Sequence, residues 1–229
     1  MLLDGQTALV TGTGRGIGPA IAAALRAEGA RVLCHARTED DARRAATELG
    51  GEPVWGDLGE AAGVAEAAAR ALELAPELHV LVHNAGILRR GTVTDARVDD
   101  VEASFAVNVI APFSLTQQLL PALRRAGHAR IVVVSSTMGQ FTNGMSGGSL
   151  PYRLSKAAVN AFTLSAAADL AGDGILVNAM HPGWVRTDMG GRAASVAPEE
   201  AARTALQLAT IDAGGPTGRF WRDGVEIPW

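Results

Sequence analysis

The amino-acid sequence predicts a doubly wound α/β domain, in which helices cover both faces of one parallel sheet. Short β-branched runs alternate with Ala- and Leu-rich helical stretches along the chain, without a repeat or a composition break. The run Ile131–Val134 is apolar at every position, which is typical of a strand buried on both faces. The length of 229 residues and the hydrophobic content of 48% suit a single domain, residues 1–229, with a sheet of about seven strands.

The predicted elements alternate from the N-terminus onward. Strands are expected near residues 6–11, 30–35, 52–55, 78–83, 130–135, 175–180 and 218–222. Helices are expected near residues 16–28, 38–49, 60–75, 97–126, 151–171 and 198–211, the fourth of them broken at Pro112. Because ligands of such sheets bind beyond the carboxyl ends of the strands, the residues that follow each strand are the candidate functional residues.

The composition excludes several classes of partner. Lysine and arginine total 20 against 24 aspartate and glutamate, and the net charge of −4 does not favour a nucleic acid or an anionic membrane surface. No stretch reaches the ~18 apolar residues of a membrane span and no targeting pattern is present, so we expect a cytoplasmic protein that binds small molecules. The single cysteine, Cys34, is expected to be a buried free thiol. The five histidines lack the spacing of metal ligands, so no metal site is expected.

A glycine-rich segment, Thr11–Gly18, follows the first predicted strand and opens the first predicted helix. Gly12, Gly16 and Gly18 would let the backbone approach a pyrophosphate, which free N–H groups and the positive end of the helix then hold. Pro19 fits here because the N–H that it lacks would have no intrahelical partner in the first turn. A glycine pattern alone is weak, but the strand before it and the helix after it indicate a dinucleotide site.

The end of the second strand distinguishes the nucleotides, because an acidic residue about 20 residues past the glycines would bind the ribose 2′-hydroxyl. The strand ends instead in His35-Ala36-Arg37. Arg37 and Arg15 could clamp a 2′-phosphate, so NADP(H) is favoured over NAD(H). The alternative is that both are solvated surface arginines. Glu39 and Asp40 are predicted to be first-turn acids of the next helix.

Tyr152 and Lys156 are four residues apart at the start of the helix predicted near 151–171, with Pro151 at its first position. This spacing puts both side chains on one helix face, about 6 Å apart. A cation so close would lower the pKa of the phenol and make Tyr152 a usable proton donor or acceptor. Taken by itself, such a pair is more often a surface pair.

Further motifs accompany these along the chain. The set comprises Thr11–Gly18, His83–Gly86, Asn108, Ser136, Tyr152–Lys156 and Pro182-Gly183. In this combination the sequence resembles the classical short-chain dehydrogenase/reductase family over essentially its whole length. The resemblance implies an NADP(H)-dependent oxidoreductase similar to carbonyl reductases, which moves a hydride to or from an aldehyde, ketone or quinone carbonyl.

The resemblance also implies a role for each catalytic residue. Ser136 would hydrogen-bond the substrate oxygen, and Tyr152 would act as acid or base. Lys156 would bind the nicotinamide ribose and lower the tyrosine pKa, while Asn108 would orient a water that passes protons through Lys156. The stretch between Ser136 and Tyr152 is a few residues longer than the common pattern, so Ser135 is an alternative to Ser136, as is Ser149.

Cofactor contacts follow from the same resemblance, which places Asp57 at the adenine, Asn84 on the adenosine side and Thr187 at the nicotinamide amide. The expected cofactor-binding residues are Gly12, Arg15, Gly16, Ile17, Gly18, Arg37, Asp57, Leu58, Asn84, Ala85, Gly86, Tyr152, Lys156, Pro182, Gly183, Val185 and Thr187. Structural alternatives remain open, because Asn84 and Asn108 could be turn or helix-break residues and Asp57 a helix cap. His83, where the family usually has Asn, is expected to be a structural substitution.

Two other functions compete with this interpretation. Gly144–Gly148 fits the G-x-S-x-G pattern of a serine hydrolase with Ser146 as nucleophile, and His181 follows later in the chain. However, a poor strand precedes Ser146 and a proline interrupts before the helix, so a flexible loop beside the substrate pocket explains the same residues. The second alternative is a catalytically silent protein of the same fold that senses NADP(H).

The substrate pocket is expected beyond the fifth and sixth strands and should be apolar and open. Its expected lining is Met138, Phe141, Met145, Trp184 and Met189. The helices near 111–126 and 151–171 are apolar on more faces than one sheet can cover. We therefore expect a homodimer or homotetramer built through these two helices, as the family resemblance also implies.

Overall fold

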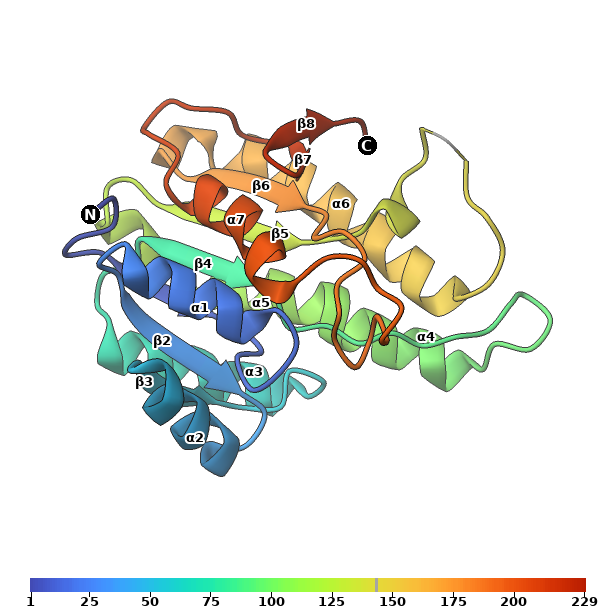
Figure 1. The fold of residues 1–229 in the computed structure, drawn as a ribbon. Coiled ribbons are helices and arrows are strands. Elements are labelled where there is room, and N and C mark those ends of the chain that lie inside the picture. The colour runs from blue at the N-terminus through green and yellow to red at the C-terminus, as the bar shows by residue number, and fades with distance from the viewer. Residues whose placement is uncertain (143) are drawn as a thin grey trace.

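The structure, a computed structural model, describes residues 1–142 and 144–229. Within these residues, eight strands form one sheet in the order β3-β2-β1-β4-β5-β6-β7-β8 (Figure 1). Strands β1 to β7 pair in parallel, and β8 runs antiparallel to β7. The strands are β1 Thr7–Val10, β2 Arg31–Ala36, β3 Glu52–Trp55, β4 Val80–His83, β5 Arg130–Val134, β6 Leu176–Met180, β7 Phe220–Arg222 and β8 Val225–Ile227. The predicted doubly wound α/β fold is confirmed.

Helices cover both faces of the sheet, as Figure 1 shows. One face carries α1 (Gly18–Ala27), α2 (Glu39–Leu49) and α7 (Pro198–Ala209). The other carries α3 (Ala61–Leu74), α5 (Ala111–Arg125) and α6 (Leu150–Asp169). A shorter helix, α4 (Val98–Phe105), packs against α6.

Two separate apolar cores explain the uninterrupted hydrophobic strands. In β1, Ala8 and Val10 pack with the α1 and α7 side, whereas Leu9 packs with the α3 and α5 side. In β5, Val132 and Ile131 divide between the two cores in the same way. Alternate residues of a strand point to opposite faces, so a strand buried on both faces needs apolar residues at every position.

The eighth strand is an addition to the roughly seven strands expected from the sequence. Asp223 and Gly224 have φ values of 49° and 81°, which is the turn geometry that joins two strands in a tight hairpin. This hairpin pairs β7 with the short strand Val225–Ile227. The three residues of β8, one of them Glu226, are too few to show an alternating pattern, although the Asp-Gly pair itself is a recognised hairpin signal.

The long helix expected near 97–126 is not broken at Pro112. Instead, α4 continues through a π-helical turn, Ala106–Ile110, directly into α5. Pro112 lies in the first turn of α5, where its ring is tolerated, so the irregularity lies one turn earlier than predicted.

The apolar stretches of the described residues stay short of membrane-spanning length. No helix among residues 1–142 and 144–229 combines the length and hydropathy that a bilayer crossing needs. Cys34 is a buried free thiol, as expected.

Candidate active site

The glycine-rich segment lies between the end of β1 and the start of α1, at the carboxyl edge of the sheet. Gly12 has φ +73° and its Cα lies so close to Ala85 that a Cβ would be 3.0 Å from the Ala85 Cα. A Cβ on Gly18 would stand 2.1 Å from the Gly12 carbonyl oxygen. Only glycine fits at Gly18, because the first turn of α1 packs directly on the loop that precedes it.

Thr11 and Asn84 join the glycine loop to the end of β4. The Asn84 side-chain amide donates to the carbonyl oxygens of Thr11 and Gly12, at 2.7 and 3.1 Å. The Thr11 hydroxyl accepts from the backbone N–H groups of Asn84 and Ala85 and donates to the Val82 carbonyl. Asn84 thus has a structural role in the loop, which the sequence left open as one of two alternatives.

Arg15 and Arg37 both lie exposed at the carboxyl edge of the sheet, Arg15 in the glycine loop and Arg37 after β2. Among the described residues, neither guanidinium forms an ion pair. The acids that follow are engaged elsewhere, because Glu39 pairs with Arg43 and Asp41 pairs with Arg44. Both guanidinium groups are therefore available to an anion.

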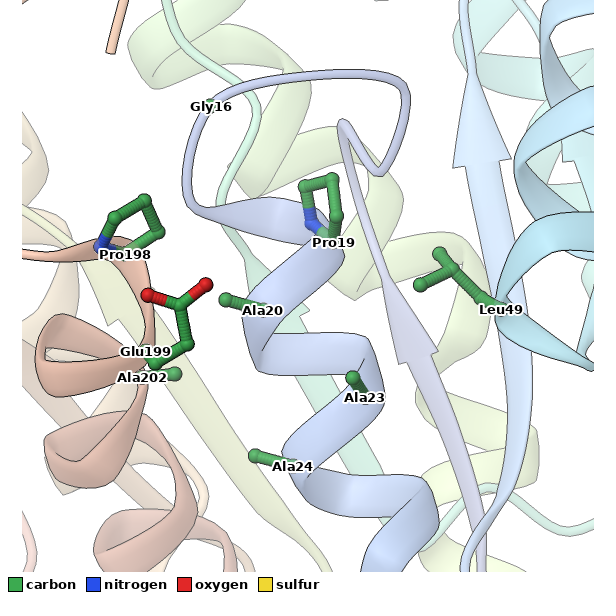
Figure 2. Close-up of a pocket in the computed structure, with 9 residues that line it drawn as sticks. All are labelled: Gly16, Pro19, Ala20, Ala23, Ala24, Leu49, Pro198, Glu199 and Ala202. Carbon is green, nitrogen blue, oxygen red and sulfur yellow. The ribbon is translucent and has the colours of Figure 1, made fainter. Parts of the chain in front are cut away.

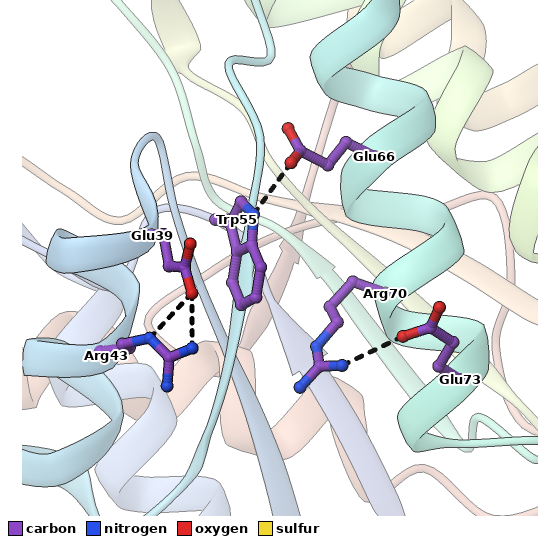
Figure 3. A network of polar contacts seen from close by, with 6 residues as sticks. All are labelled: Glu39, Arg43, Trp55, Glu66, Arg70 and Glu73. Carbon is purple, nitrogen blue, oxygen red and sulfur yellow. Dashed lines mark hydrogen bonds and ion pairs between the residues drawn. The ribbon is translucent and has the colours of Figure 1, made fainter.

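A network beside this site occupies the acids and arginines of α2 and α3 (Figure 3). The Trp55 ring lies between the guanidinium groups of Arg43 and Arg70, at 5.7 and 5.2 Å from the ring centroid. Its indole N–H donates to Glu66. Glu39 and Asp40 lie in the first turn of α2, as predicted.

Asp57 and Leu58 follow β3. Asp57 is exposed, and one carboxylate oxygen accepts from the Gly59 backbone N–H at 2.8 Å, while Leu58 is buried in the core. The second carboxylate oxygen of Asp57 accepts no hydrogen bond from the described residues 1–142 and 144–229.

Tyr152 and Lys156 lie in the first turns of α6, and Ser136 lies just beyond the carboxyl end of β5. All three are at most 8% exposed. The Lys156 ammonium lies 5.6 Å from the centroid of the Tyr152 ring and donates to the Val134 carbonyl at 2.7 Å. Ser136 is near enough to the Tyr152 hydroxyl to lower its pKa, and the Ser136 hydroxyl accepts from the Met138 N–H at 3.1 Å. The chain contains one tyrosine, and Lys156 is its only lysine.

The sequence predicts that Lys156 lowers the pKa of Tyr152, but burial is the larger influence on this phenol. Burial raises the pKa of Tyr152 to about 12, and Ser136 offsets only part of this effect. Burial likewise lowers the pKa of Lys156 to about 8. Removal from water disfavours the charged form of each group. At neutral pH the phenol therefore carries its proton.

Asn108 lies in the π-helical turn between α4 and α5. Its side-chain amide is held by the backbone N–H and C=O of Ile87 and by the Ser155 hydroxyl, each at 2.9 Å. Pro112 lacks the N–H that would bond the Asn108 carbonyl in a regular α-helix. Single π turns of this kind are frequent at functional sites.

Gly86 lies between Asn108 and Lys156. A Cβ at this position would be 3.2 Å from the Asn108 side-chain oxygen and 3.8 Å from the Lys156 nitrogen. The Asn108 amide and the Lys156 ammonium therefore both lie next to Gly86. His83, three residues earlier, is buried and bonds the Thr116 hydroxyl at 2.8 Å, a contact within the core.

The structure separates the three candidate serines. Ser135 is buried and hydrogen-bonds Asn160 of α6, away from Tyr152. Ser149 precedes α6 in a left-handed conformation with φ 52°, and its side chain makes no cap bond. Of the three, Ser136 is the serine that influences the pKa of Tyr152. The side chains alternate after β5, which is why adjacent serines face different partners.

Ser146 does not lie in a nucleophile elbow. Residues 140–142 and 144–149 form no strand leading into it, and its hydroxyl accepts from Arg153 at 2.6 Å. Arg153 also donates to the carbonyls of Gly148 and Met138. The sequence motifs do not include Arg153, which joins the loop before α6 to the helix that carries Tyr152. Its position next to the tyrosine was the only available signal.

The segment that follows β6 carries the remaining residues that the sequence predicts to bind the cofactor. Pro182 and Gly183, with φ +82° at the glycine, turn the chain after the strand, and Val185 is buried and bridges to Val196. Thr187 accepts from the Gly190 N–H, and the Trp184 indole donates to the Gly190 carbonyl. A shallow pocket beside Thr187 is lined by Arg186, Thr187, Asp188, Gly191 and Arg192.

Four of the five predicted pocket residues are exposed large apolar side chains, and Met138 is half-buried. The four are Phe141, Met145, Trp184 and Met189. These four apolar side chains are therefore open to solvent. A separate groove of about 490 Å³ runs along the outer side of α1, between α7 and Leu49, with Gly16 at one end (Figure 2). Four of its nine lining residues are alanines, and Glu199 is the one charged residue among them.

Known proteins are similar to this chain in sequence and in architecture. The model of the family described as short chain dehydrogenase matches residues 6–197. Oxidoreductase UcpA of Salmonella typhimurium is 36% identical over 192 residues, which cover 82% of this chain and 72% of that protein. C-signal of Myxococcus xanthus is 36% identical over 154 residues, which cover 66% of this chain and 92% of that protein. The NADPH-bound carbonyl reductase from chicken fatty liver superposes with a TM-score of 0.88 at 29% identity, covering 99% of this chain and 100% of that one.

The chain therefore belongs to the short-chain dehydrogenase family. It is an oxidoreductase of that family, as the motifs predicted, and the serine hydrolase alternative is wrong.

Proposed function

We propose that the protein is an NADP(H)-dependent reductase of hydrophobic aldehydes, ketones or quinones, with Tyr152 as its acid and base. The observation that carries the proposal is the buried cluster of Tyr152, Ser136 and Lys156 at the carboxyl edge of the sheet. The nicotinamide, when bound, would supply or accept the hydride. The residues of the chain supply the proton and hold the substrate oxygen.

Each catalytic residue has a distinct task in this proposal. Tyr152 donates its proton to the carbonyl oxygen as the hydride reaches the carbon, and the Ser136 hydroxyl donates a second hydrogen bond to the same oxygen. Burial keeps the phenol protonated at neutral pH, which is the form that reduction needs. Lys156, whose pKa of about 8 leaves it mostly charged at neutral pH, would contact the ribose and stabilise the phenolate that remains. Asn108, beside Gly86 and Lys156, orients the water that returns the proton.

The cofactor site is proposed from the glycine loop and its surroundings. Gly16, Ile17 and Gly18 would hold the pyrophosphate at the start of α1, and Gly12 would let the backbone approach it closely. Asp57 and Leu58 would face the adenine, and Asn84 to Gly86 the adenosine and ribose. Pro182, Gly183, Val185 and Thr187 would border the nicotinamide. The NADPH in the carbonyl reductase with the same fold supports a nicotinamide cofactor here.

Arg37→Ala is expected to raise the Kd of NADPH about tenfold and to change that of NADH less than about twofold, because one charge-assisted bond to the 2′-phosphate is lost. Titration of reduced-cofactor fluorescence measures both constants. Arg44→Ala is the matched control, because that exposed arginine pairs with Asp41. An equal effect of Arg37→Ala on both cofactors would remove the case for a 2′-phosphate clamp.

The exposed apolar side chains that are predicted to line the pocket support a hydrophobic substrate. Phe141 and Trp184 are more than half exposed, and a bound apolar body would cover them. The direct test mixes the protein with NADPH or NADH and a panel of aldehydes, ketones and quinones, and follows the absorbance of the reduced cofactor. Turnover of at least one carbonyl compound with NADPH is expected, and consumption by none would contradict the proposal.

A regulatory protein that binds NADP(H) without turnover is the second candidate. The similarity to a protein named C-signal favours it, since 92% of that protein aligns with this chain. The intact set of Asn108, Ser136, Tyr152 and Lys156 favours the enzyme, because a protein that only binds has no use for it. The carbonyl panel separates the two.

We also propose that the protein is a homodimer or homotetramer through α5 and α6. Large apolar side chains are exposed along both helices, among them Phe113 and Leu164. Phe113→Arg is expected to reduce the sedimenting species to a monomer, because a charge would be buried without a partner. Val93→Arg is the control, because Val93 is exposed and lies outside these helices. A monomeric wild-type protein would contradict this assembly.

A further inference from the structure

His35 lies near the end of strand β2. Its side chain is buried between two loops that would surround the nucleotide. It is 3% exposed and belongs to β2, one residue before Ala36. On one side lies Gly12 of the glycine loop, and on the other lies Gly56, the residue before Asp57. No proposed catalytic or cofactor contact uses this side chain.

We infer that His35 is a positioning residue that holds the pyrophosphate loop at a set distance from the adenine-side turn. The inference rests on the proposed nucleotide site and adds a residue that the cofactor does not touch. It follows from a hydrogen bond at each end of one imidazole ring.

The two hydrogen bonds determine the tautomer. The Gly12 backbone N–H donates to Nδ1 at 3.2 Å, so this nitrogen carries no proton. Nε2 therefore carries the proton and donates to the Gly56 carbonyl at 3.0 Å. The backbone of His35 adds to the same junction, because its carbonyl accepts from the Thr13 N–H at 2.8 Å and from the Thr13 hydroxyl at 3.1 Å.

A neutral imidazole suits this place because it offers one donor and one acceptor. Burial lowers the pKa of His35 to about 4, and the nearby Asp57 carboxylate opposes this only in part. The ring is therefore neutral at physiological pH. Both backbone partners are tightly placed, since a Cβ on Gly56 would lie 2.0 Å from the Gly63 carbonyl. The ring thus connects two segments that have little freedom of their own.

This arrangement has a consequence for phosphate binding. The Gly12 N–H is satisfied by His35, so it is not free for a phosphate oxygen. The N–H groups at the start of α1, next to Gly16 and Gly18, then have to hold the pyrophosphate. Their placement depends on the loop that His35 anchors.

The test compares three substitutions in the full-length chain. His35→Leu removes both hydrogen bonds, whereas the amide of His35→Gln can accept from Gly12 and donate to Gly56. Kd for NADPH is measured by fluorescence titration and by calorimetry, and kcat is measured at saturating NADPH. We expect His35→Leu to weaken NADPH at least about tenfold with kcat within about twofold of wild type, and His35→Gln to recover most of the affinity.

The outcomes separate this inference from the proposed function. Wild-type affinity in His35→Leu, or no recovery in His35→Gln, overturns the positioning role. Should His35→Leu fail to fold, His35→Asn replaces it, because its shorter amide reaches only one of the two loops, and the same recovery by Gln is required. A wild-type protein that binds NADPH but reduces no carbonyl would contradict the proposed function and leave the role of His35 to be decided by the Kd values. A wild-type protein that binds neither NADPH nor NADH overturns both.

Discussion

Tyr152→Phe is expected to lower kcat by about three orders of magnitude while the Kd of NADPH stays within about twofold of wild type. The substitution removes the hydroxyl that lies near Ser136 and retains the ring beside the Lys156 ammonium. Proton donation to the substrate oxygen is lost, whereas the ring that packs beside the cofactor site is kept. Steady-state kinetics with any carbonyl compound that the wild type reduces, together with NADPH titration, measures both quantities.

Because the chain has no second tyrosine, no neighbouring phenol can replace the lost group. Ser135→Ala is a suitable control, since Ser135 is adjacent to the site but bonds Asn160 instead of Tyr152. It should retain most of the turnover. Unchanged turnover in Tyr152→Phe would contradict the assignment of Tyr152 as acid.

Gly18→Ala is expected to weaken NADPH binding about a hundredfold. Its Cβ would stand 2.1 Å from the Gly12 carbonyl oxygen and 2.7 Å from the Asn84 amide nitrogen, and neither can withdraw without breaking the contact between the loop and β4. Overpacking of this kind costs about 2 to 3 kcal/mol, which corresponds to the stated loss of affinity. Calorimetric titration with NADPH measures it.

Gly14→Ala is the matched control within the same loop. A Cβ on Gly14 would meet only the Ala36 Cβ, at 3.9 Å, which is ordinary contact. Its affinity for NADPH should stay within about threefold of wild type. Equal affinities of the two variants would show that the close approach at Gly18 does not matter for the cofactor.

The elements of the sheet and the order of the motifs could be predicted from the sequence because both are local properties. Continuous apolar runs such as Ile131–Val134 mark buried strands, and the alternation with helical stretches requires a parallel sheet. The helix that begins at Pro151 places Tyr152 and Lys156 one turn apart, and the observed separation agrees with that spacing. The family could likewise be predicted, because its motifs lie at strand ends in a regular order.

The eighth strand, the π turn before Pro112 and the pKa of Tyr152 could not be predicted in this way. Each depends on more than a local pattern: β8 on its partner strand, the π turn on where the helix absorbs the N–H that Pro112 lacks, and the pKa on the burial of the phenol. The sequence shows a cation four residues from Tyr152, but it does not show how little water reaches the ring.

The sequence by itself therefore determined the fold class, the glycine-rich loop between a strand and a helix, and the spacing of Tyr152 and Lys156, since these follow from periodicity and from spacing within single elements. Only the tertiary structure decided which partner each side chain meets. Ser136 faces Tyr152 while Ser135 faces Asn160, and His35 contacts Gly12 from 23 residues along the chain. The physical reason is that a hydrogen bond needs two groups within about 3 Å, and the packing of distant segments, not their order in the sequence, brings such groups together.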